Sequence, residues 1–302
     1  MNDVSRGRPP RMVMTTHYWH PHTGGIETVA AAQASGLTAR GWAVEAHTSR
    51  TVGATTAGEQ RADVAIHRHA ALNPLERTLR VPVPLPLPGL TRALATATGN
   101  ADVVVSHGHV YPITLAASKA ATRQGRPFVL VQHNPWVDYP APVAAIERAA
   151  DRTVGRKVIE RSKVVVCVSE HTAAYVHSIV PHARTVVVPN GVDRQRFVPA
   201  VRRVNEPVVR FVCVRRLVPR NGVDLLIEAW RRAHVTSEAQ LTIAGDGPER
   251  AELERRARDL PTVTFAGRVD DATLVELMQQ ADATVVPTRS GEGFGLVAAE
   301  SL

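Results

Sequence analysis

The sequence predicts an α/β protein made of two doubly wound parallel sheets, and three observations lead to this prediction. Short runs rich in β-branched residues alternate with amphipathic stretches along the whole chain. Strands of a parallel sheet are covered on both faces, so continuous apolar runs are typical of them. The length of 302 residues favours two domains. Finally, residues 189–207 are rich in turn and charged residues, lack periodicity and separate two series of strands.

The first series is expected to form the N-terminal domain, residues 1–195. Its predicted strands are 11–16 (RMVMTT), 102–107 (DVVVSH), 127–133 (PFVLVQH), 163–169 (KVVVCVS) and 184–190 (RTVVVPN). After the first of them, a segment opening at Gly24–Glu27 places four apolar side chains on one helical face: Ile26, Val29, Ala30 and Leu37. The order strand, helix, strand indicates a parallel sheet.

The second series follows a linker at 196–206 and forms the expected C-terminal domain, residues 207–302. Its predicted strands are 209–214 (VRFVCV), 241–245 (LTIAG), 263–267 (VTFAG) and 283–287 (ATVVP). Val223, Leu226, Ile227 and Trp230 fall at i, i+3, i+4 and i+7, the spacing of an amphipathic helix. This series is shorter than the first, so we expect the C-terminal domain to be incomplete.

Composition limits the classes of molecule that the protein is expected to bind and indicates its cellular compartment. The net charge of +8 comes from scattered arginines, with no basic run interleaved with aromatic residues, so nucleic acid is not the expected partner. Cys167 and Cys213 lie in apolar runs and are expected to be buried, unpaired thiols in a reducing compartment. No signal peptide or apolar membrane segment is present. We therefore expect a soluble, cytoplasmic protein.

Residues 81–90 (VPVPLPLPGL) carry proline at alternate positions, which forbids a helix and a central strand. An extended loop packed on its own domain is the favoured interpretation. Contact with a lipid or an apolar acceptor is the alternative. Peripheral association with the inner face of the membrane therefore remains open at this point.

Two glycine-containing turns and one arginine pair are candidate anion sites. Gly24 and Gly25 precede a helix, where backbone amides favour a phosphate, although a plain strand–helix turn explains them equally well. Gly245 opens a segment (GDGPER) that begins like a dinucleotide motif but has Arg250 in place of the third glycine. Arg216 follows a strand, at the end where open sheets bind ligands. Arg216 and Arg220 are also explained as surface residues of an arginine-rich protein.

The C-terminal segment 290–302 (SGEGFGLVAAESL) places two carboxylates, Glu292 and Glu300, around a glycine-rich turn. Gly293 and Gly295 are expected to leave backbone amides open to an anion at the start of a helix that carries Glu300. Carboxylates beside a phosphate are favourable only where they accept hydrogen bonds from hydroxyl groups. A phosphate next to a polyol indicates a sugar nucleotide, against the alternative of an ordinary charged helix after a glycine loop.

Three histidines lie at or just after the ends of predicted strands in the first series, namely His107, His109 and His133. Each is expected at the carboxyl edge of the sheet, where a lone histidine is more often structural than functional. Their spacing does not match a metal site, so a metal-independent reaction without a cofactor is expected.

Taken in order, these segments resemble the retaining glycosyltransferases of the GT-B fold, the group that includes bacterial mannosyl- and glucosyltransferases and sucrose synthase (glycosyltransferase family 4, group 1 type). The resemblance covers nearly the whole chain. The segments that carry it are 18–49 (YWHPHTGGIETVAAAQASGLTARGWAVEAHTS), 169–176 (SEHTAAYV), 186–199 (VVVPNGVDRQRFVP), 215–230 (RRLVPRNGVDLLIEAW), 241–253 (LTIAGDGPERAEL), 263–269 (VTFAGRV) and 287–301 (PTRSGEGFGLVAAES).

The resemblance implies two Rossmann-like domains, the second binding a nucleotide-diphosphate sugar and the first the acceptor, with a front-face retaining reaction and no metal. Arg216 would neutralise the leaving diphosphate, Glu292 would hold the donor sugar and Glu300 the ribose, and His133 would lie against the transferred sugar. The remaining implied donor-binding residues are Gly25, Asn221, Gly245, Arg268, Val269, Asp271, Gly293, Phe294, Gly295 and Leu296. The acceptor-side residues would be Gly24, Glu27, His107 and His109.

The chain departs from the family pattern at two positions. A glycine commonly precedes the arginine and a lysine follows it five residues on, whereas this chain has Arg215 and Asn221 there. Asn221 carries no charge, so diphosphate neutralisation must depend on Arg216, with Arg215 or Arg220 as candidate helpers. Asp271 is a weak indication of guanine, and capping of a helix is the favoured explanation for it.

We therefore expect transfer of a hexosyl group from GDP-mannose or a UDP-sugar to a sugar, polyol or lipid-linked glycan. The alternatives are a non-catalytic nucleotide-sugar-binding relative and a GT-B epimerase or phosphorylase. An NAD dehydrogenase is disfavoured because no complete fingerprint is present. The segment after Glu300 is short, so the sequence is interpreted as a C-terminally truncated fragment that binds donor weakly. The oligomeric state is left open.

Overall fold

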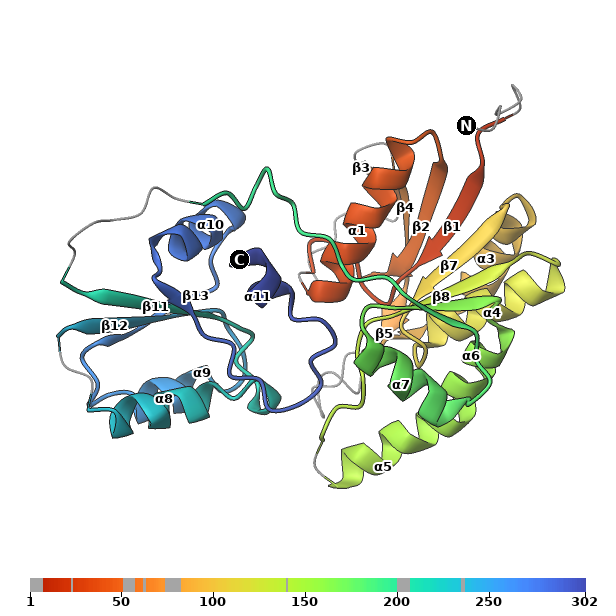
Figure 1. The fold of residues 1–302 in the computed structure, drawn as a ribbon. Helices are drawn as coiled ribbons and strands as arrows, with labels where there is room; N and C mark the ends of the chain where they lie inside the picture. The colour runs from red at the N-terminus through yellow and green to blue at the C-terminus, as the bar shows by residue number, and fades with distance from the viewer. Residues whose placement is uncertain are drawn as a thin grey trace. The chain divides into compact units, whose positions relative to one another are not determined.

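The computed structural model describes residues 8–22, 24–50, 58–61, 64–73, 83–139, 141–199, 207–234 and 237–302. The chain divides into two compact units (Figure 1). Unit 1 comprises Met1–Pro135 and Pro140–Pro189, and unit 2 comprises Trp136–Tyr139 and Asn190–Leu302. The expected domain limits at 195 and 207 stay predictions, and residues 200–206 of the expected linker lie outside the described residues.

Unit 1 contains an eight-stranded sheet in the order β10-β9-β8-β7-β1-β2-β4-β3. Every neighbouring pair is parallel except β3 and β4, which are antiparallel. The strands are β1 (Arg11–Thr15), β2 (Ala43–Ser49), β3 (Gly58–Arg61), β4 (Val64–His69), β7 (Val103–His107), β8 (Phe128–Gln132), β9 (Val164–Cys167) and β10 (Thr185–Val187). The predicted doubly wound α/β fold is therefore confirmed for this unit.

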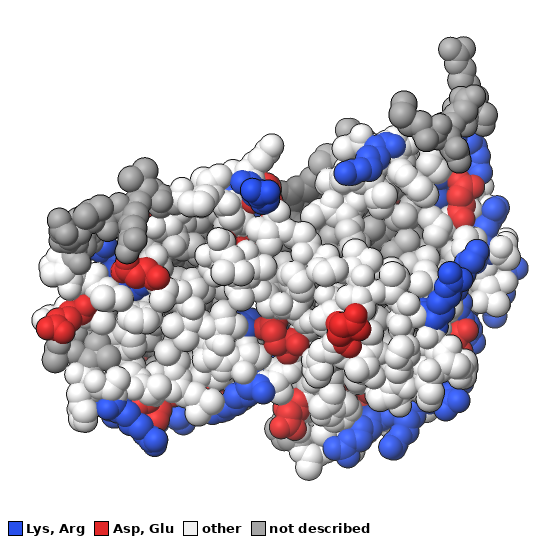
Figure 2. Space-filling model, in the orientation of Figure 1, with Lys and Arg blue, Asp and Glu red and all other residues white. Residues whose placement is uncertain are grey.

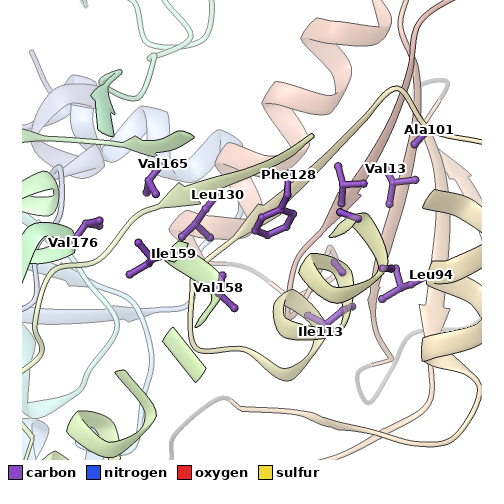
Figure 3. Packing of buried hydrophobic residues seen from close by; sticks show 14 of the residues in the cluster. Val13, Leu94, Ala101, Ile113, Phe128, Leu130, Val158, Ile159, Val165 and Val176 are labelled. Carbon is purple, nitrogen blue, oxygen red and sulfur yellow. The ribbon is translucent and has the colours of Figure 1, made fainter. Parts of the chain in front are cut away.

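Helices cover both faces of the sheet in unit 1. They are α1 (Gly25–Thr38), α3 (Leu90–Gly99), α4 (Pro112–Arg123), α5 (Ala141–Ala150), a π-helical turn (Asp151–Gly155), α6 (Arg156–Arg161) and α7 (Glu170–Ile179). Successive side chains of a strand point to opposite faces of the sheet, so each strand contributes side chains to the apolar core on either face. Met12 and Met14 pack on the α1 side, whereas Val13 lies in the core that α3, α4, α6 and α7 cover (Figure 3).

The proline-rich segment contributes a second, two-stranded sheet to unit 1. β6 (Leu85–Pro86) pairs with β5 (Ala71–Leu72) in antiparallel register. Proline is tolerated here because each strand has only one neighbour. Leu72, Leu85 and Leu87 are exposed, with 58%, 41% and 39% of their surface accessible. Val81 and Pro82 lie outside the described residues.

Unit 2 contains a four-stranded parallel sheet in the order β13-β12-β11-β14. The strands are β11 (Val209–Val214), β12 (Ala239–Ala244), β13 (Val263–Gly267) and β14 (Ala283–Thr284). Its helices are a 3₁₀ turn (Pro219–Asn221), α8 (Val223–Arg232), α9 (Arg250–Arg256), α10 (Asp271–Gln280) and α11 (Leu296–Glu300). The predicted apolar face of α8 is confirmed, since Val223, Leu226, Ile227 and Trp230 are all buried.

Strand order reverses once in each unit, and the reversal marks where ligands bind in open α/β sheets. In unit 1 the chain proceeds from β1 to β2 on one side and later returns to β7 on the other side of β1. In unit 2 β11 is followed by β12 and β13 on one side and by β14 on the other. The carboxyl ends of β1, β7, β11 and β14 are therefore the first places to look for a site.

Three further properties bear on the expected compartment and partners. Cys167 and Cys213 are both free and buried, as predicted. Among the described residues, no helix is both long enough and apolar enough to cross a membrane. On the face shown in Figure 2, the described Lys and Arg side chains form separate groups with acidic side chains among them.

Candidate functional site

Three buried histidines lie at the carboxyl ends of three neighbouring strands of unit 1. His17 follows β1, His107 ends β7 and His133 follows β8, and they are 4%, 0% and 6% exposed. His107 Nδ1 lies 2.8 Å from His133 Nε2, and the two rings stack with centroids 5.1 Å apart. The His17 ring stacks flat on Tyr111 at 4.0 Å. We call His17, His107, His133 and the neighbouring Glu27 the histidine cluster.

Burial keeps the imidazoles of this cluster neutral. It lowers the pKa of His17 and of His133 to about 4, in both cases against a smaller opposing effect of the Glu27 charge. Burial and the neighbouring His133 lower the pKa of His107 well below its usual value. A neutral imidazole offers one donor and one acceptor, which suits a hydroxyl group better than a phosphate.

Glu27 enters the cluster from the first turn of α1. Its Oε1 lies 3.5 Å from His17 Nε2 and 3.3 Å from His22 Nδ1. Burial raises the pKa of Glu27, but the His22 and His17 imidazoles outweigh burial and hold the pKa below its usual value. Gly24 precedes the helix, and a Cβ atom there would require the Glu27 carboxylate to shift. Gly25 is the first residue of α1.

The cluster contains buried polar atoms that lack a protein partner. Among the described residues, His17 Nδ1 and His107 Nε2 have no hydrogen-bond partner. A buried polar group without a partner costs about 1–3 kcal/mol. A hydroxyl group is one kind of partner that a neutral imidazole nitrogen accepts. The structure thus brings together Glu27 and His107, named for the acceptor side, and His133, named for the transferred sugar, and adds His17.

His109 belongs to a different, structural network. Its Nδ1 lies 3.0 Å from Gln132 Oε1 and its Nε2 lies 2.8 Å from Asp151 Oδ1. The Tyr175 hydroxyl donates to the other Asp151 oxygen at 2.8 Å. Both ring nitrogens of His109 are therefore engaged within the protein, so contact with an acceptor would require one of these hydrogen bonds to break.

Replacing Asp151 by Ala is expected to lower the free energy of unfolding by about 2–4 kcal/mol, because buried groups of His109 and Tyr175 lose their acceptor. Urea unfolding followed by circular dichroism measures the change. The matched control is Glu160→Ala, which removes an exposed ion pair with Arg156 and should cost at most about 0.5 kcal/mol. Equal losses in the two variants would contradict the structural role of the network.

In unit 2 an ion pair lies at the carboxyl ends of β11 and β14. Arg215 Nη2 lies 2.5 Å from Glu292 Oε2 and also donates to Thr288 Oγ1. The Arg215 side chain is 11% exposed and that of Glu292 is 37% exposed. Arg215 occupies the position where the family pattern has glycine. This chain therefore has a positive charge beside Glu292, the residue expected to hold the donor sugar.

Arg216 and Asn221 have different roles in the loop after β11. Arg216 is exposed at the carboxyl edge of the sheet. The Asn221 amide donates to the Arg216 carbonyl oxygen at 2.7 Å, so the residue that replaces the family lysine fastens the loop and adds no charge. Of Arg216 and Asn221, only Arg216 carries a charge, and Arg216 is exposed.

The glycine-rich turn before α11 differs from the expectation in one respect. The Gly295 amide is not open, because it donates to Glu292 Oε1 at 2.9 Å. Gly295 has φ 81° and ψ 52°, a left-handed conformation that favours glycine. Gly293 is buried, and Phe294 and Leu296 are half-buried. The expectation of open amides at both glycines is thus wrong for Gly295.

Glu300 is the last residue of α11, so the helix predicted to carry it is present. Burial raises the pKa of Glu300, and Arg196 partly offsets this effect. A partly buried carboxylate gains more from hydroxyl donors than one that is fully hydrated. This environment fits the expected ribose-binding role, which stays a prediction.

Asp271 does not cap a helix, which overturns the favoured explanation for it. The N-cap of α10 is Asp270, whose side chain accepts from the Thr273 amide at 2.8 Å. Asp271 lies within the first turn, 86% exposed and 2.9 Å from Arg196 Nη2. Its carboxylate thus remains accessible to a ligand.

The remaining donor-side candidates lie at the ends of β12 and β13. Gly245 follows β12, and a Cβ atom there would collide with the Arg215 carbonyl oxygen. A glycine at this position therefore allows the loops after β11 and β12 to approach closely. Arg268 is exposed and Val269 half-buried directly after β13.

Sequence reasoning missed several of these residues. His17 and His22 were not singled out, although His17 follows a predicted strand just as His107 and His133 do. Glu45, His47 and His67 were also missed, and their ligand atoms all lie within 4.8 Å of one another, so they could hold a metal ion. Alternation along β2 and β4 was the signal that would have found them.

Comparisons with known proteins identify the family of the chain. A model of the glycosyltransferase family 4 matches residues 23–196, and a model of the glycosyl transferases group 1 matches residues 194–302. A GDP-mannose-dependent alpha-(1-6)-phosphatidylinositol monomannoside mannosyltransferase of Mycolicibacterium smegmatis is 30% identical over 96% of this chain and 77% of its own length. A glycogen synthase of Mycobacterium tuberculosis is 30% identical over 63% of this chain but only 44% of its own length.

Solved structures support the fold. Sucrose-phosphate synthase from Thermosynechococcus elongatus matches with a TM-score of 0.74 at 19% identity, covering 97% of this chain and 78% of that one. HepE of Anabaena, solved with UDP and glucose, matches with a TM-score of 0.71 at 17% identity and the same coverage. Identities this low indicate a shared fold and no more.

Proposed function

Because the chain belongs to glycosyltransferase family 4, we propose that it transfers a hexosyl group from a nucleotide-diphosphate sugar to a hydroxyl acceptor. One observation carries the proposal. Arg215, Arg216 and Glu292 gather at the carboxyl ends of β11 and β14, where strand order reverses. Cations and a hydroxyl-binding carboxylate together match the two halves of a sugar nucleotide.

GDP-mannose is the proposed donor. The relative that is similar over 96% of this chain is described as GDP-mannose-dependent. Asp271 supports the same choice, because its exposed carboxylate does not cap α10 and a carboxylate pairs well with the two N–H donors of guanine. A UDP-sugar is the second candidate, since HepE was solved with UDP and glucose.

In the proposed reaction the Arg216 guanidinium stabilises the negative charge that develops on the leaving diphosphate, which makes a metal ion unnecessary there. Glu300 accepts from the ribose hydroxyls and Glu292 from a donor-sugar hydroxyl. The acceptor hydroxyl attacks from the face that the diphosphate leaves and gives its proton to the departing phosphate oxygen. The new glycosidic bond then keeps the configuration of the donor.

Unit 1 is proposed to bind the acceptor. The unpartnered nitrogens of His17 and His107 and the buried carboxylate of Glu27 suit hydroxyl groups. The exposed side chains of Leu72, Leu85 and Leu87 fit an acceptor carried on a lipid, with the protein associated peripherally with the membrane surface. The name of the Mycolicibacterium relative describes a lipid-linked acceptor.

A non-catalytic, nucleotide-sugar-binding protein is the second candidate function. Asn221 favours it, because this residue supplies no charge to the diphosphate and is committed to the loop through the Arg216 carbonyl oxygen. Binding of a donor without transfer or hydrolysis would support this candidate.

The test is transfer of radiolabelled sugar to vesicles that contain phosphatidylinositol mannosides, with GDP-mannose and UDP-glucose as parallel donors. We expect label from GDP-mannose to enter the lipid fraction. Nuclear magnetic resonance of the product should show the anomeric configuration of the donor, and chelators should leave the rate unchanged. Transfer from UDP-glucose alone would assign the second donor, and no transfer from either would contradict a transferase acting on this lipid acceptor.

A further inference from the structure

A second group of polar side chains lies on the sheet of unit 1, apart from the histidine cluster and sharing no residue with it. Glu45 and His47 are two positions apart on β2, so both side chains emerge on one face of the sheet. His67 lies on β4, and the register pairs it directly with His47. The strand ladder therefore fixes these three residues beside one another.

The ligand atoms of Glu45, His47 and His67 all lie within 4.8 Å of one another. Glu45 Oε1 lies 2.9 Å from His47 Nε2 and 3.2 Å from His67 Nε2. In a tetrahedral zinc site, with ligand atoms about 2.0–2.1 Å from the metal, neighbouring ligand atoms are roughly 3.3 Å apart. The two separations from Glu45 Oε1 are close to this value, and the separation between the two histidine nitrogens is within 4.8 Å.

Stacked rings hold the group in place. His47 is 2% exposed, and its ring stacks on those of His67 and His69 with centroids 4.9 and 5.1 Å away. His69 Nε2 lies 2.9 Å from His47 Nδ1, the nitrogen that faces away from Glu45. Metal-binding histidines usually have such a hydrogen bond on the second nitrogen, which fixes the ring orientation and the tautomer.

The group opens onto a pocket of about 490 Å³. Its lining also includes Arg92 and Thr96 of α3 and the following Asn100. An ion could enter from this side, and water could occupy the remaining coordination positions. The site thus has three candidate ligands close together, a supporting hydrogen bond and an open side, which are among the properties expected of a metal site.

We propose that Glu45, His47 and His67 bind one divalent transition-metal ion, with Zn²⁺ as the best match, and that the ion ties β2 to β4. Two imidazoles and one carboxylate suit zinc and its neighbours, whereas Mg²⁺ and Ca²⁺ prefer oxygen ligands alone. The role is structural. The transfer reaction stays metal-independent in our account, so the two proposals stand or fall separately.

The test uses the full chain without a histidine tag, freed of metal by dialysis against a chelator. Zn²⁺ binding is measured by calorimetry, coordination by the visible absorption of bound Co²⁺, and stability by the unfolding temperature with and without Zn²⁺. We expect one ion per chain, tetrahedral Co²⁺ bands and a higher unfolding temperature with Zn²⁺ but not with Mg²⁺.

Variants decide whether the ion occupies this site. Glu45→Gln and His67→Ala should each weaken Zn²⁺ binding at least about 10-fold, and His69→Ala, a positioning variant, about 10- to 100-fold. Glu45 and His67 are partly exposed, so both variants are expected to fold. Circular dichroism checks their folding. His182→Ala, at an exposed histidine of the same unit, should bind as the parent does. Absence of one-to-one binding in the parent, or affinity unchanged in Glu45→Gln and His67→Ala, would overturn the proposal.

Discussion

Replacing Arg216 by Ala is expected to lower kcat for sugar transfer about 100- to 1000-fold, while donor affinity falls much less. The reason lies in the loop after β11. Arg216 is exposed at the carboxyl edge of the sheet, and Asn221 contributes an amide to its backbone and no charge. Charge on the leaving diphosphate increases in the transition state, so the loss should appear mainly in kcat. Steady-state kinetics with varied GDP-mannose, together with calorimetric donor binding, separates the two effects.

Arg220→Ala is the matched control, since it removes a second arginine from the same loop. Its side chain is half-buried, and its backbone oxygen already accepts from the Arg289 amide. We expect kcat close to that of the parent. A loss equal to that of Arg216→Ala would show that the charge is shared along the loop, and an unchanged kcat in Arg216→Ala would refute the assigned role.

Acidification from pH 6.5 to pH 4 is expected to destabilise unit 1 by several kcal/mol. The folded-state pKa of His17 and of His133 is about 4, below the ordinary value of 6.5. The unfolded chain therefore binds more protons in this window, and the free energy of unfolding falls as the pH falls. Each shift corresponds to roughly 3 kcal/mol. His107 acts in the same direction.

Urea unfolding between pH 4 and pH 8 measures this dependence. His17→Gln and His133→Gln should each make the loss of stability on acidification smaller, because one group that must stay neutral is removed. His182→Gln changes an exposed histidine of the same unit and should leave the pH dependence unaltered. Equal stability of the parent at pH 4 and pH 6.5 would contradict the buried, neutral state of the cluster.

Apolar patterning was sufficient to predict the fold class. Continuous β-branched runs located the strands at the centre of both sheets, and the spacing of Leu226, Ile227 and Trp230 predicted the buried face of α8. Strands with one polar face were harder to predict from the sequence. β2 and β4 alternate apolar residues with Glu45, His47 and His67, and such alternation is weaker than an unbroken apolar run.

The candidate site residues were named one by one from strand ends and from the family resemblance, and their roles stay predictions; their contacts were not predicted. Strand ends predict an edge of the sheet, which is why Arg216, His107 and His133 were singled out as candidates. The pairing of Arg215 with Glu292 joins residues far apart in sequence, and only tertiary structure shows it. The capping residue was misplaced by one position, because Asp270 and Asp271 are chemically equal and only backbone geometry distinguishes them.

Calorimetric titration with GDP-mannose, performed on the parent chain and on Glu300→Gln, tests the central claim most directly. In the proposed function, the Glu300 carboxylate accepts hydrogen bonds from the ribose when the donor binds to unit 2. We predict one donor per parent chain and an affinity about 10- to 100-fold lower in the variant, the cost of about 1.5–3 kcal/mol for hydrogen bonds to a charged group. A parent chain that binds none of the three donors GDP-mannose, UDP-glucose and ADP-glucose would contradict the account.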